Sequence, residues 1–166
     1  MFQLAYIYAK ARKGEIPDIY LQDEKYFAEY KDELRAIFGE GVEPVDMVSI
    51  HVRRTDYVNN SFYVDLMDTN YYERATDLFP GEKFLVFSDD IEWCKEQPIF
   101  KDCVFSEKND ELTDLKLMAG CKAHIIANSS YSWWAAYISG NQTVVPSKWF
   151  TDDVERISLP KAWIQL

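Results

Sequence analysis

The sequence predicts an α/β domain with a doubly wound parallel sheet, preceded by a short helical segment. From residue 46 onward, short runs rich in Val, Ile and Phe alternate with segments of helical periodicity. This alternation is typical of β–α–β units, whose right-handed crossovers place helices on both faces of a parallel sheet. The 166 residues, 48% of them hydrophobic, are enough for one core but not for two. We therefore expect one domain with at most a truncated neighbour.

Two helices are expected ahead of the sheet. The first covers residues 1–13, where aromatic and small residues recur at helical spacing and a glycine follows. The second covers residues 23–38, where apolar residues form one stripe and Gly39 ends the pattern. Because a linker with two glycines and a proline comes next, we divide the chain into a helical part, residues 1–40, and an α/β part, residues 45–166.

The strands and helices of the α/β part follow in a regular order. The predicted strands are 47–52, 84–87, 103–105, 123–127 and 143–145. The predicted helices are 71–78, one that begins at Ile91, 111–119 and 132–138. In open parallel sheets the ligand binds beyond the carboxyl ends of the strands. The polar residues that directly follow each strand are therefore the candidate site.

Composition limits the partners of this chain. With 18 Lys and Arg against 28 Asp and Glu, the net charge is −10, which repels nucleic acids and anionic membranes. Any anionic ligand must be held by a local basic cluster. The three cysteines form no C-x-x-C pair, so we expect neither a disulfide framework nor a zinc site, and a reducing compartment, the cytoplasm. No apolar run is long enough to span a bilayer, so at most peripheral membrane association is expected.

The first polar cluster follows the strand 47–52 and reads His51-Val52-Arg53-Arg54-Thr55-Asp56-Tyr57. Alternation along the strand places Ser49, His51 and Arg53 on one face. Two adjacent guanidiniums predict a diphosphate clamp, because the planar fork binds phosphate oxygens in pairs and keeps its charge. The alternative is a surface pair in which Arg54 bridges to Asp56 and His51 is merely packed.

The second cluster is the acidic pair Asp89 and Asp90, between the strand 84–87 and the helix that begins at Ile91. One interpretation is an N-cap, in which a carboxylate accepts from the free amides of the first helical turn. The other is recognition of guanine, whose Watson–Crick edge presents adjacent N–H donors to a carboxylate. A metal site is disfavoured, because there is no D-x-D spacing and no histidine nearby.

The third cluster, Asn128-Ser129-Ser130, lies between a buried strand and a helix. Hydroxyls and free backbone amides at a helix start are suited to anion binding. The alternative is simple capping by Ser129 or Ser130. We expect Trp133 and Trp134 to lie in the core and His124 to be a hydrogen-bonded core histidine.

These clusters resemble the three ordered motifs of the α-1,2-fucosyltransferases, glycosyltransferase family 11. The matching segments are His51 to Tyr57, Phe87 to Cys94 and Asp114 to Trp134, followed by Pro146 to Phe150. Met1-Phe2-Gln3 also resembles the end of the family's glycine-containing N-terminal loop. The resemblance thus covers residues 46 to about 150 and touches the start of the chain.

The resemblance implies a metal-independent enzyme of the glycosyltransferase B-type fold. Such enzymes need no cofactor and transfer fucose from GDP-fucose to the 2-hydroxyl of a galactose-containing glycan, with inversion at the anomeric carbon. Residues 45–166 would then be the GDP-fucose-binding domain, and residues 1–40 a remnant of the acceptor-side domain. Since the chain is little more than half the usual length of a family member, we expect a truncated member.

The resemblance also implies roles for individual residues. Arg53 and Arg54 match the positions expected at the GDP phosphates, with the hydroxyls of Ser129, Ser130 and Ser132 beside them. Asp89 or Asp90 would face the guanine. The full expected donor-binding set is His51, Arg53, Arg54, Asp89, Asp90, Asn128, Ser129, Ser130 and Ser132. The expected catalytic residues are Asp56, as a candidate base, and Arg53.

Two other functions stay open from the sequence. A catalytically impaired fragment would bind only GDP or GDP-fucose. An interaction module would use some of the 10 Phe, 11 Tyr and 5 Trp residues to bind carbohydrate or protein, although most of these aromatic residues lie at core spacing.

Overall fold

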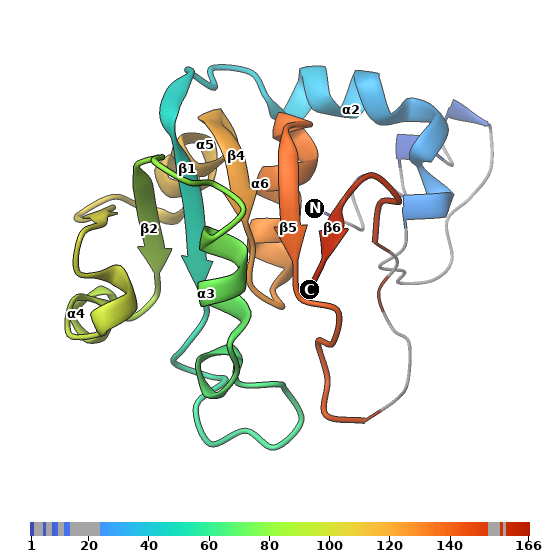
Figure 1. Cartoon of the computed structure of the whole chain (residues 1–166). Coiled ribbons are helices and arrows are strands. Elements are labelled where there is room, and N and C mark those ends of the chain that lie inside the picture. The colour runs from blue at the N-terminus through green and yellow to red at the C-terminus, as the bar shows by residue number, and fades with distance from the viewer. Residues whose placement is uncertain (2–4, 6–7, 10–11, 14–23, 153–156, 158) are drawn as a thin grey trace.

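The computed structural model describes residues 1, 5, 8–9, 12–13, 24–152, 157 and 159–166 (Figure 1). Its centre is a six-stranded sheet in the order β3-β2-β1-β4-β5-β6, and each pair of neighbouring strands is parallel. The strands are β1 (Val45–Val52), β2 (Phe84–Ser88), β3 (Val104–Phe105), β4 (Cys121–Ile125), β5 (Gln142–Val145) and β6 (Ile164–Gln165). The doubly wound parallel sheet is confirmed, because the chain moves outward from β1 in both directions.

Helices cover both faces of the sheet. The helices and 3-10 turns of the α/β part are η3 (Leu66–Asp68), α3 (Tyr71–Thr76), α4 (Ile91–Lys95), η4 (Pro98–Phe100), α5 (Glu111–Gly120) and α6 (Ser130–Ser139). Figure 1 shows α3 on the front of the sheet and α5 and α6 behind it. The predicted strands and helices of this region are confirmed to within two residues at their ends.

The central strand β1 is buried on both faces, as expected for a parallel sheet. Val48, Ile50 and Val52 pack in one hydrophobic cluster with residues of α3. Ser49 and His51 face the other way and are also buried, so the predicted alternation is confirmed. The Ser49 hydroxyl lies 2.8 Å from Nδ1 of His124, which confirms His124 as a hydrogen-bonded core histidine.

Helix α6 contributes most of an aromatic core. Trp133 and Trp134 are 0% and 2% exposed, and Trp133 stacks on Tyr137 with ring centroids 4.7 Å apart. Phe27 adds a further ring, stacked on Trp134 at 5.7 Å. The expected core position of both tryptophans is confirmed.

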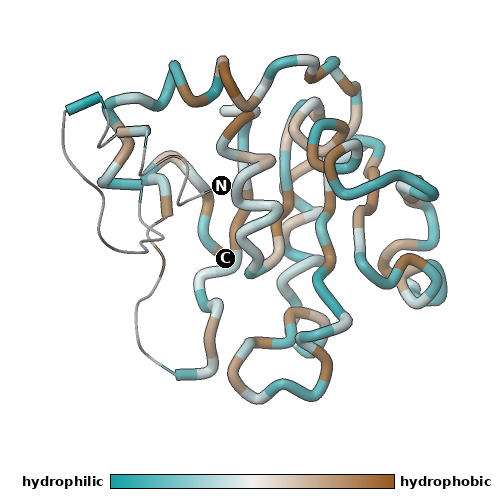
Figure 2. The backbone as a smooth tube through the Cα atoms, turned by 180° about the vertical axis from the view of Figure 1, so that it is seen from behind, coloured by the Kyte–Doolittle hydropathy of each residue, from teal (hydrophilic) through white to brown (hydrophobic). Residues whose placement is uncertain are grey.

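The single helix expected over residues 23–38 is wrong. The described part of this segment is broken into η1 (Glu24–Tyr26), η2 (Ala28–Tyr30) and α2 (Lys31–Phe38). At Phe27 the backbone leaves the helical region, with φ of −142°, and its side chain is fully buried. Burial of this ring against α6 outweighs the weak preference of the local sequence for one continuous helix. Helix α2 begins with hydrophilic residues and ends with hydrophobic ones, and Figure 2 shows both kinds along it.

Most of the helix expected at residues 1–13 lies outside the described residues. Among the described residues of this segment, Ala5 and Ala9 are helical and fully or almost fully buried. They belong to the same hydrophobic cluster as Leu34 and Trp133. The division into a remnant domain and a donor domain stays a prediction.

Two further observations complete the fold. The edge strand β6 was not expected, because the segment around it contains Pro160 and Lys161 and has no continuous apolar run. Within the part of the chain that the structure describes, no helix is both long enough and apolar enough to span a membrane.

Candidate functional site

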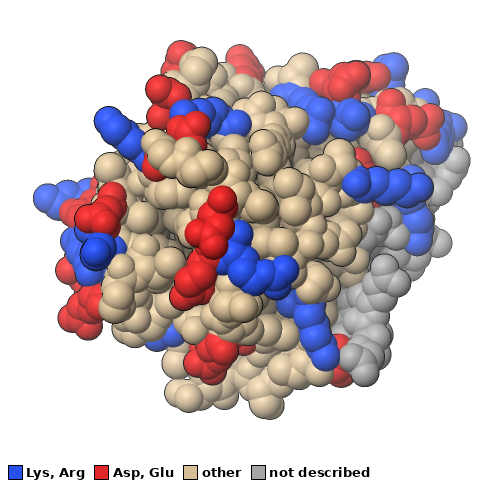
Figure 3. Space-filling model, in the orientation of Figure 1, with Lys and Arg blue, Asp and Glu red and all other residues tan. Residues whose placement is uncertain are grey.

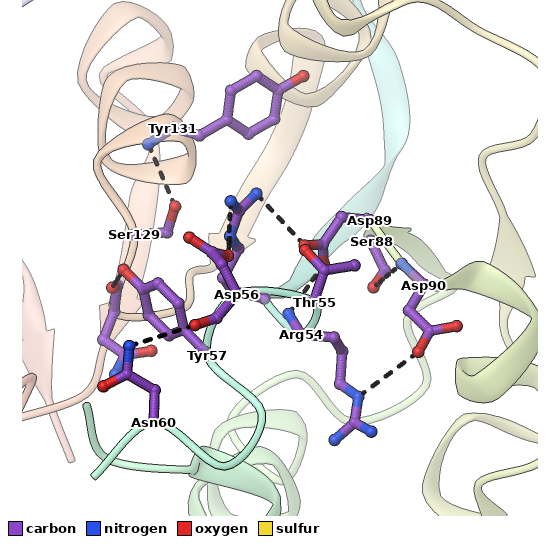
Figure 4. Close-up of polar contacts among 12 residues, drawn as sticks. Arg54, Thr55, Asp56, Tyr57, Asn60, Ser88, Asp89, Asp90, Ser129 and Tyr131 are labelled. Carbon is purple, nitrogen blue, oxygen red and sulfur yellow. Dashed lines mark hydrogen bonds and ion pairs between the residues drawn. The ribbon is translucent and has the colours of Figure 1, made fainter. Parts of the chain in front are cut away.

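The candidate site lies where the chain reverses direction across the sheet. The strand order changes between β1 and β4, and in doubly wound sheets ligands bind at the carboxyl ends of the strands beside such a switch point. The first polar cluster begins at the end of β1, the third begins three residues after the end of β4, and the second follows β2, the other neighbour of β1. The topology therefore brings all three predicted clusters to one edge of the sheet (Figure 4).

Asp89 joins the first cluster to the second. Its carboxylate accepts a hydrogen bond from the Arg54 backbone amide at 2.8 Å and another from the Thr55 hydroxyl. Nη1 of Arg53 lies 3.4 Å from the same carboxylate. Burial acts to raise the pKa of Asp89, but these hydrogen bonds and the Arg53 charge together lower the pKa below its ordinary value. Asp89 is therefore an ionised anchor for the loop after β1.

Arg53 is held by two carboxylates. Its Nε and Nη2 atoms lie 2.9 and 2.7 Å from Oδ1 of Asp56, and Asp89 lies on the other side. The expected alternative placed Arg54 on Asp56, and this is wrong. Successive side chains in extended backbone point in opposite directions, so Arg53, which continues the face of His51, reaches Asp56.

Arg54 has a different set of neighbours. Its guanidinium carbon lies 3.5 Å from the centre of the Trp93 ring, and its Nε lies 3.9 Å from Oδ2 of Asp90. Asp90 also caps α4, since its Oδ1 accepts from the Trp93 amide at 3.4 Å. The capping interpretation is thus confirmed for Asp90. The side chains of the two adjacent arginines are held by different partners, and Asp89 meets Arg53 through its guanidinium but Arg54 only through its backbone amide.

His51 lies behind Arg53 in a dry environment. It is 3% exposed, and its ring is 5.6 Å from that of Tyr131 at the start of α6. Burial lowers the pKa of His51 to about 4, so the imidazole is neutral at pH 7. Its Nδ1 has no hydrogen-bond partner among the described residues.

Asn128 connects the loops that follow three strands. Its side-chain amide donates to the backbone oxygens of Val64 and Trp149, both at 2.9 Å, and its own backbone oxygen accepts from the Tyr57 hydroxyl at 3.0 Å. Because the amide nitrogen is committed to two carbonyls, Asn128 acts here as a structural clip. Its predicted contact with the donor stays a prediction.

The serines of the third cluster lie at the first turn of α6. Ser129 caps the helix, because its Oγ accepts from the Tyr131 amide at 3.4 Å, so the capping interpretation is confirmed at this position. Ser132 is fully buried and donates to the Ser129 backbone oxygen, whereas Ser130 is exposed. Any ligand at this helix start would meet Ser129 and Ser130 before Ser132.

Sequence reasoning missed three members of the site: Thr55, Tyr57 and Trp93. Thr55 and Tyr57 belong to the first motif, but nothing in their spacing shows that they reach Asp89 and Asn128. Trp93 follows Asp90 by three residues, which places it in the first turn of α4. This spacing was the signal in the sequence, because residues three apart on a helix are neighbours, so that the Trp93 side chain lies near Asp90, the N-cap of α4.

No group of three potential ligands among His, Cys, Asp and Glu that could hold a metal ion occurs among the residues that the structure describes. A separate hollow at the amino end of β1 is lined by residues that include Asp46, Glu82 and Lys122. There Lys122 lies 2.8 Å from Asp46 and 2.5 Å from Glu82. Since these carboxylates neutralise the lysine, the hollow is not suited to an anion.

Comparison with known proteins identifies the family. The model of glycosyl transferase family 11 matches residues 6–165. The chain belongs to glycosyl transferase family 11. The family that the three motifs of this family 11 chain resemble is thus confirmed.

Three curated relatives of this family 11 chain have related activities. An α-1,2-colitosyltransferase of Escherichia coli is 36% identical over 93% of the chain and 63% of its own length. The O-antigen biosynthesis glycosyltransferase WbnK of Escherichia coli is 34% identical over 75% of the chain and 46% of its own length. The galactoside 2-α-L-fucosyltransferase SEC1 of Bos taurus is 31% identical over 67% of the chain and 33% of its own length. The chain therefore matches between a third and two thirds of each relative.

Solved structures give weaker similarity. The β-Kdo 2,7-transferase KpsC of Thermosulfurimonas dismutans aligns with a TM-score of 0.46 and 12% identity, over 83% of the chain and 49% of that protein. A structure of POFUT1 in complex with GDP aligns with a TM-score of 0.44 and 14% identity, over 86% of the chain and 49% of that protein.

Proposed function

We propose that this family 11 chain transfers fucose from GDP-fucose to the 2-hydroxyl of a galactoside, with inversion. The observation that carries the proposal is the match to family 11 over residues 6–165, together with relatives named as α-1,2-fucosyltransferases at 30–32% identity. Because the chain covers only 33–43% of those relatives, acceptor choice and turnover are part of the proposal. The colitosyltransferase relative makes colitose a second candidate for the transferred sugar.

In this proposal the donor diphosphate binds at the end of β1. Arg53 and Arg54 supply positive charge there, as guanidiniums can do without a metal ion. The first turn of α6, with Ser129 and Ser130, adds hydroxyls and backbone amides beside the switch point. The buried side of this site is formed by His51. The metal independence of donor binding is part of the proposal and is tested below.

The guanine base is assigned to Asp90 in preference to Asp89. Both oxygens of Asp89 already accept hydrogen bonds, from the Arg54 amide and the Thr55 hydroxyl. Asp90 uses Oδ1 to cap α4, and its Oδ2 has only the 3.9 Å contact with Arg54. Its side chain is 38% exposed, against 20% for Asp89. Asp90 is therefore the carboxylate with room for the guanine N–H donors.

Asp56 is the candidate base. Inverting transfer places the acceptor hydroxyl opposite the GDP leaving group, so that the C–O bond to the diphosphate breaks as the new bond to the sugar forms. The hydroxyl proton passes to a carboxylate, and positive charge near the diphosphate stabilises the departing GDP. Asp56 is 60% exposed and pairs with Arg53 through Oδ1 alone. Its second oxygen is therefore available for the proton.

The test combines binding with turnover. Calorimetry with GDP measures donor binding, and radiolabelled GDP-fucose with lactose measures transfer. Transfer to the galactose 2-hydroxyl supports the full proposal. Binding without transfer would favour the alternative, a chain that binds only GDP or GDP-fucose. A chain that binds neither nucleotide would contradict both, and preferential use of a colitose donor would select the second candidate.

A further inference from the structure

The second arginine of the site rests on the face of a single aromatic ring. The guanidinium carbon of Arg54 is 3.5 Å from the centre of the Trp93 ring, whereas Arg53 lies 5.7 Å from the Tyr57 ring and Arg35 lies 5.4 Å from that of Tyr137. The Arg54 side chain is only 13% exposed. Cation–π attraction is strongest in such desolvated contacts, so Trp93 fixes the plane of this guanidinium.

The hydrogen-bond donors of the two arginines are used very differently. Nε, Nη1 and Nη2 of Arg53 all face carboxylate oxygens, at distances of 2.7–3.4 Å. Nε of Arg54 is buried and has no hydrogen-bond partner among the described residues. The carboxylate oxygen nearest to this atom is Oδ2 of Asp90, at 3.9 Å, which is too far for a hydrogen bond. A buried N–H without an acceptor is costly, so an added acceptor would be favourable here.

Stacking and hydrogen bonding use different parts of a guanidinium. An aromatic ring contacts its face, whereas carboxylates and phosphates bind the N–H groups along its edge. A carboxylate partner such as Asp56, which pairs with Arg53, therefore competes with a phosphate for the same edge. Trp93 instead holds Arg54 in place and leaves that edge unused.

We propose that Trp93 is a positioning residue for the phosphates of the ligand and acts through Arg54. The ring holds the guanidinium of Arg54 in one orientation before the ligand arrives, which reduces the rotamer entropy lost on binding. Its edge then donates to phosphate oxygens. The identity of the ligand as GDP rests on the proposed function, but the role of Trp93 requires only a ligand with phosphate groups.

The experiment is a double-mutant cycle on ligand affinity. The variants are Trp93→Leu, Arg54→Ala and the double variant, with Trp93→Phe as the conservative change. Lys95→Gln is the control, because Lys95 is a cation on the same helix that pairs with Glu92 and Glu107 instead. Calorimetry measures GDP and ADP affinity, ligand-observed NMR measures guanosine affinity, and thermal unfolding reports on the fold.

We expect Trp93→Leu to weaken GDP binding by about 2- to 12-fold, the factor that corresponds to immobilising one long side chain on binding. Trp93→Phe should retain most of the affinity, and Lys95→Gln should retain all of it. Guanosine binding should not change, because guanosine has no phosphate. In the Arg54→Ala background, Trp93→Leu should have no further effect on GDP.

The outcomes separate this inference from the proposed function. If GDP is preferred over ADP but Trp93→Leu leaves GDP affinity unchanged, the positioning role is overturned and the fucosyltransferase proposal stands. If GDP and ADP bind equally, and Trp93→Leu weakens the binding of both only when Arg54 is present, the positioning role stands and the donor assignment fails. The role of Trp93 is also overturned if Trp93→Leu weakens the binding of GDP and guanosine equally. It is overturned as well if Trp93→Leu weakens GDP binding as much in the Arg54→Ala background as in the wild type. A chain that binds no phosphate-containing ligand overturns both proposals.

Discussion

At the residue scale, Asp89 anchors the loop after β1. It accepts from the Arg54 amide and the Thr55 hydroxyl and faces Arg53. Asp89→Asn replaces one oxygen by an NH₂ group that cannot accept, so one donor loses its partner. We expect a loss of about 1 to 3 kcal/mol of unfolding free energy at pH 7, measured by denaturant unfolding.

The same substitution gives a pH test with a defined sign. The pKa of Asp89 is lowered in the folded protein, so its contribution to stability is present above its unfolded pKa of about 3.9 and is lost as pH falls through the folded value. The difference in stability between wild type and Asp89→Asn should therefore shrink below about pH 4. A difference that stays constant from pH 7 to pH 3 would contradict the anchoring role.

The arginines give a prediction about phosphate recognition. Arg53→Ala and Arg54→Ala should each weaken GDP binding by about 2 to 4 kcal/mol, because each removes a partly or largely desolvated charge that would bind phosphate. Guanosine binding should change little. The measurement is calorimetry with GDP, beside ligand-observed NMR with guanosine. If both ligands lose the same affinity, the arginines only maintain the fold.

A substitution at Asp90 can separate its role as the N-cap of α4 from its proposed role in recognising guanine. Asn is about as good an N-cap as Asp, so Asp90→Asn should leave the melting temperature nearly unchanged. When the amide oxygen keeps the cap, the NH₂ group takes the place of Oδ2 and cannot accept from the guanine N–H groups, so the preference for GDP over ADP should fall by about 10-fold or more. A lower melting temperature with the preference intact would show that capping is the main role of Asp90.

At the scale of elements, Asn128 holds the loops after β1 and β5 together. Its side chain satisfies the carbonyls of Val64 and Trp149, and Asn128→Ala would leave both without this donor. We expect a loss of about 2 to 4 kcal/mol in unfolding free energy. Asn141→Ala is the matched control, because that side chain satisfies only the Cys121 carbonyl. Equal losses for the two variants would argue against a special role for Asn128.

The elements also show what the sequence could predict. Strands β1 to β5 were predictable because each contains a short apolar run, and the burial of β1, β2, β4 and β5 agrees with that pattern. The break at Phe27 was not predictable, because it depends on contact with Trp134 and Tyr137, more than 100 residues away. The pairing of Arg53 with Asp56 follows from strand alternation, which the sequence shows. The contact of Arg54 with Trp93 depends on how α4, which packs beside β2, reaches the loop after β1, and the sequence does not show this.

At the scale of the whole molecule, the site is a basic pair in an acidic protein. The net charge is −10, and Figure 3 shows acidic and basic side chains interspersed over one face. Long-range attraction therefore contributes little to binding an anionic nucleotide. Affinity must come from the contacts at the ends of β1, β2 and β4, so GDP binding should depend more on Arg53 and Arg54 than on total charge.

The most direct measurement of the central claim is calorimetric titration of GDP and ADP into the wild-type chain, with and without EDTA. The account predicts that GDP binds more tightly than ADP and that EDTA changes neither affinity, because guanidiniums and the first turn of α6 supply the positive charge. Binding of GDP only in the presence of magnesium or manganese, or no preference for guanine, would contradict it.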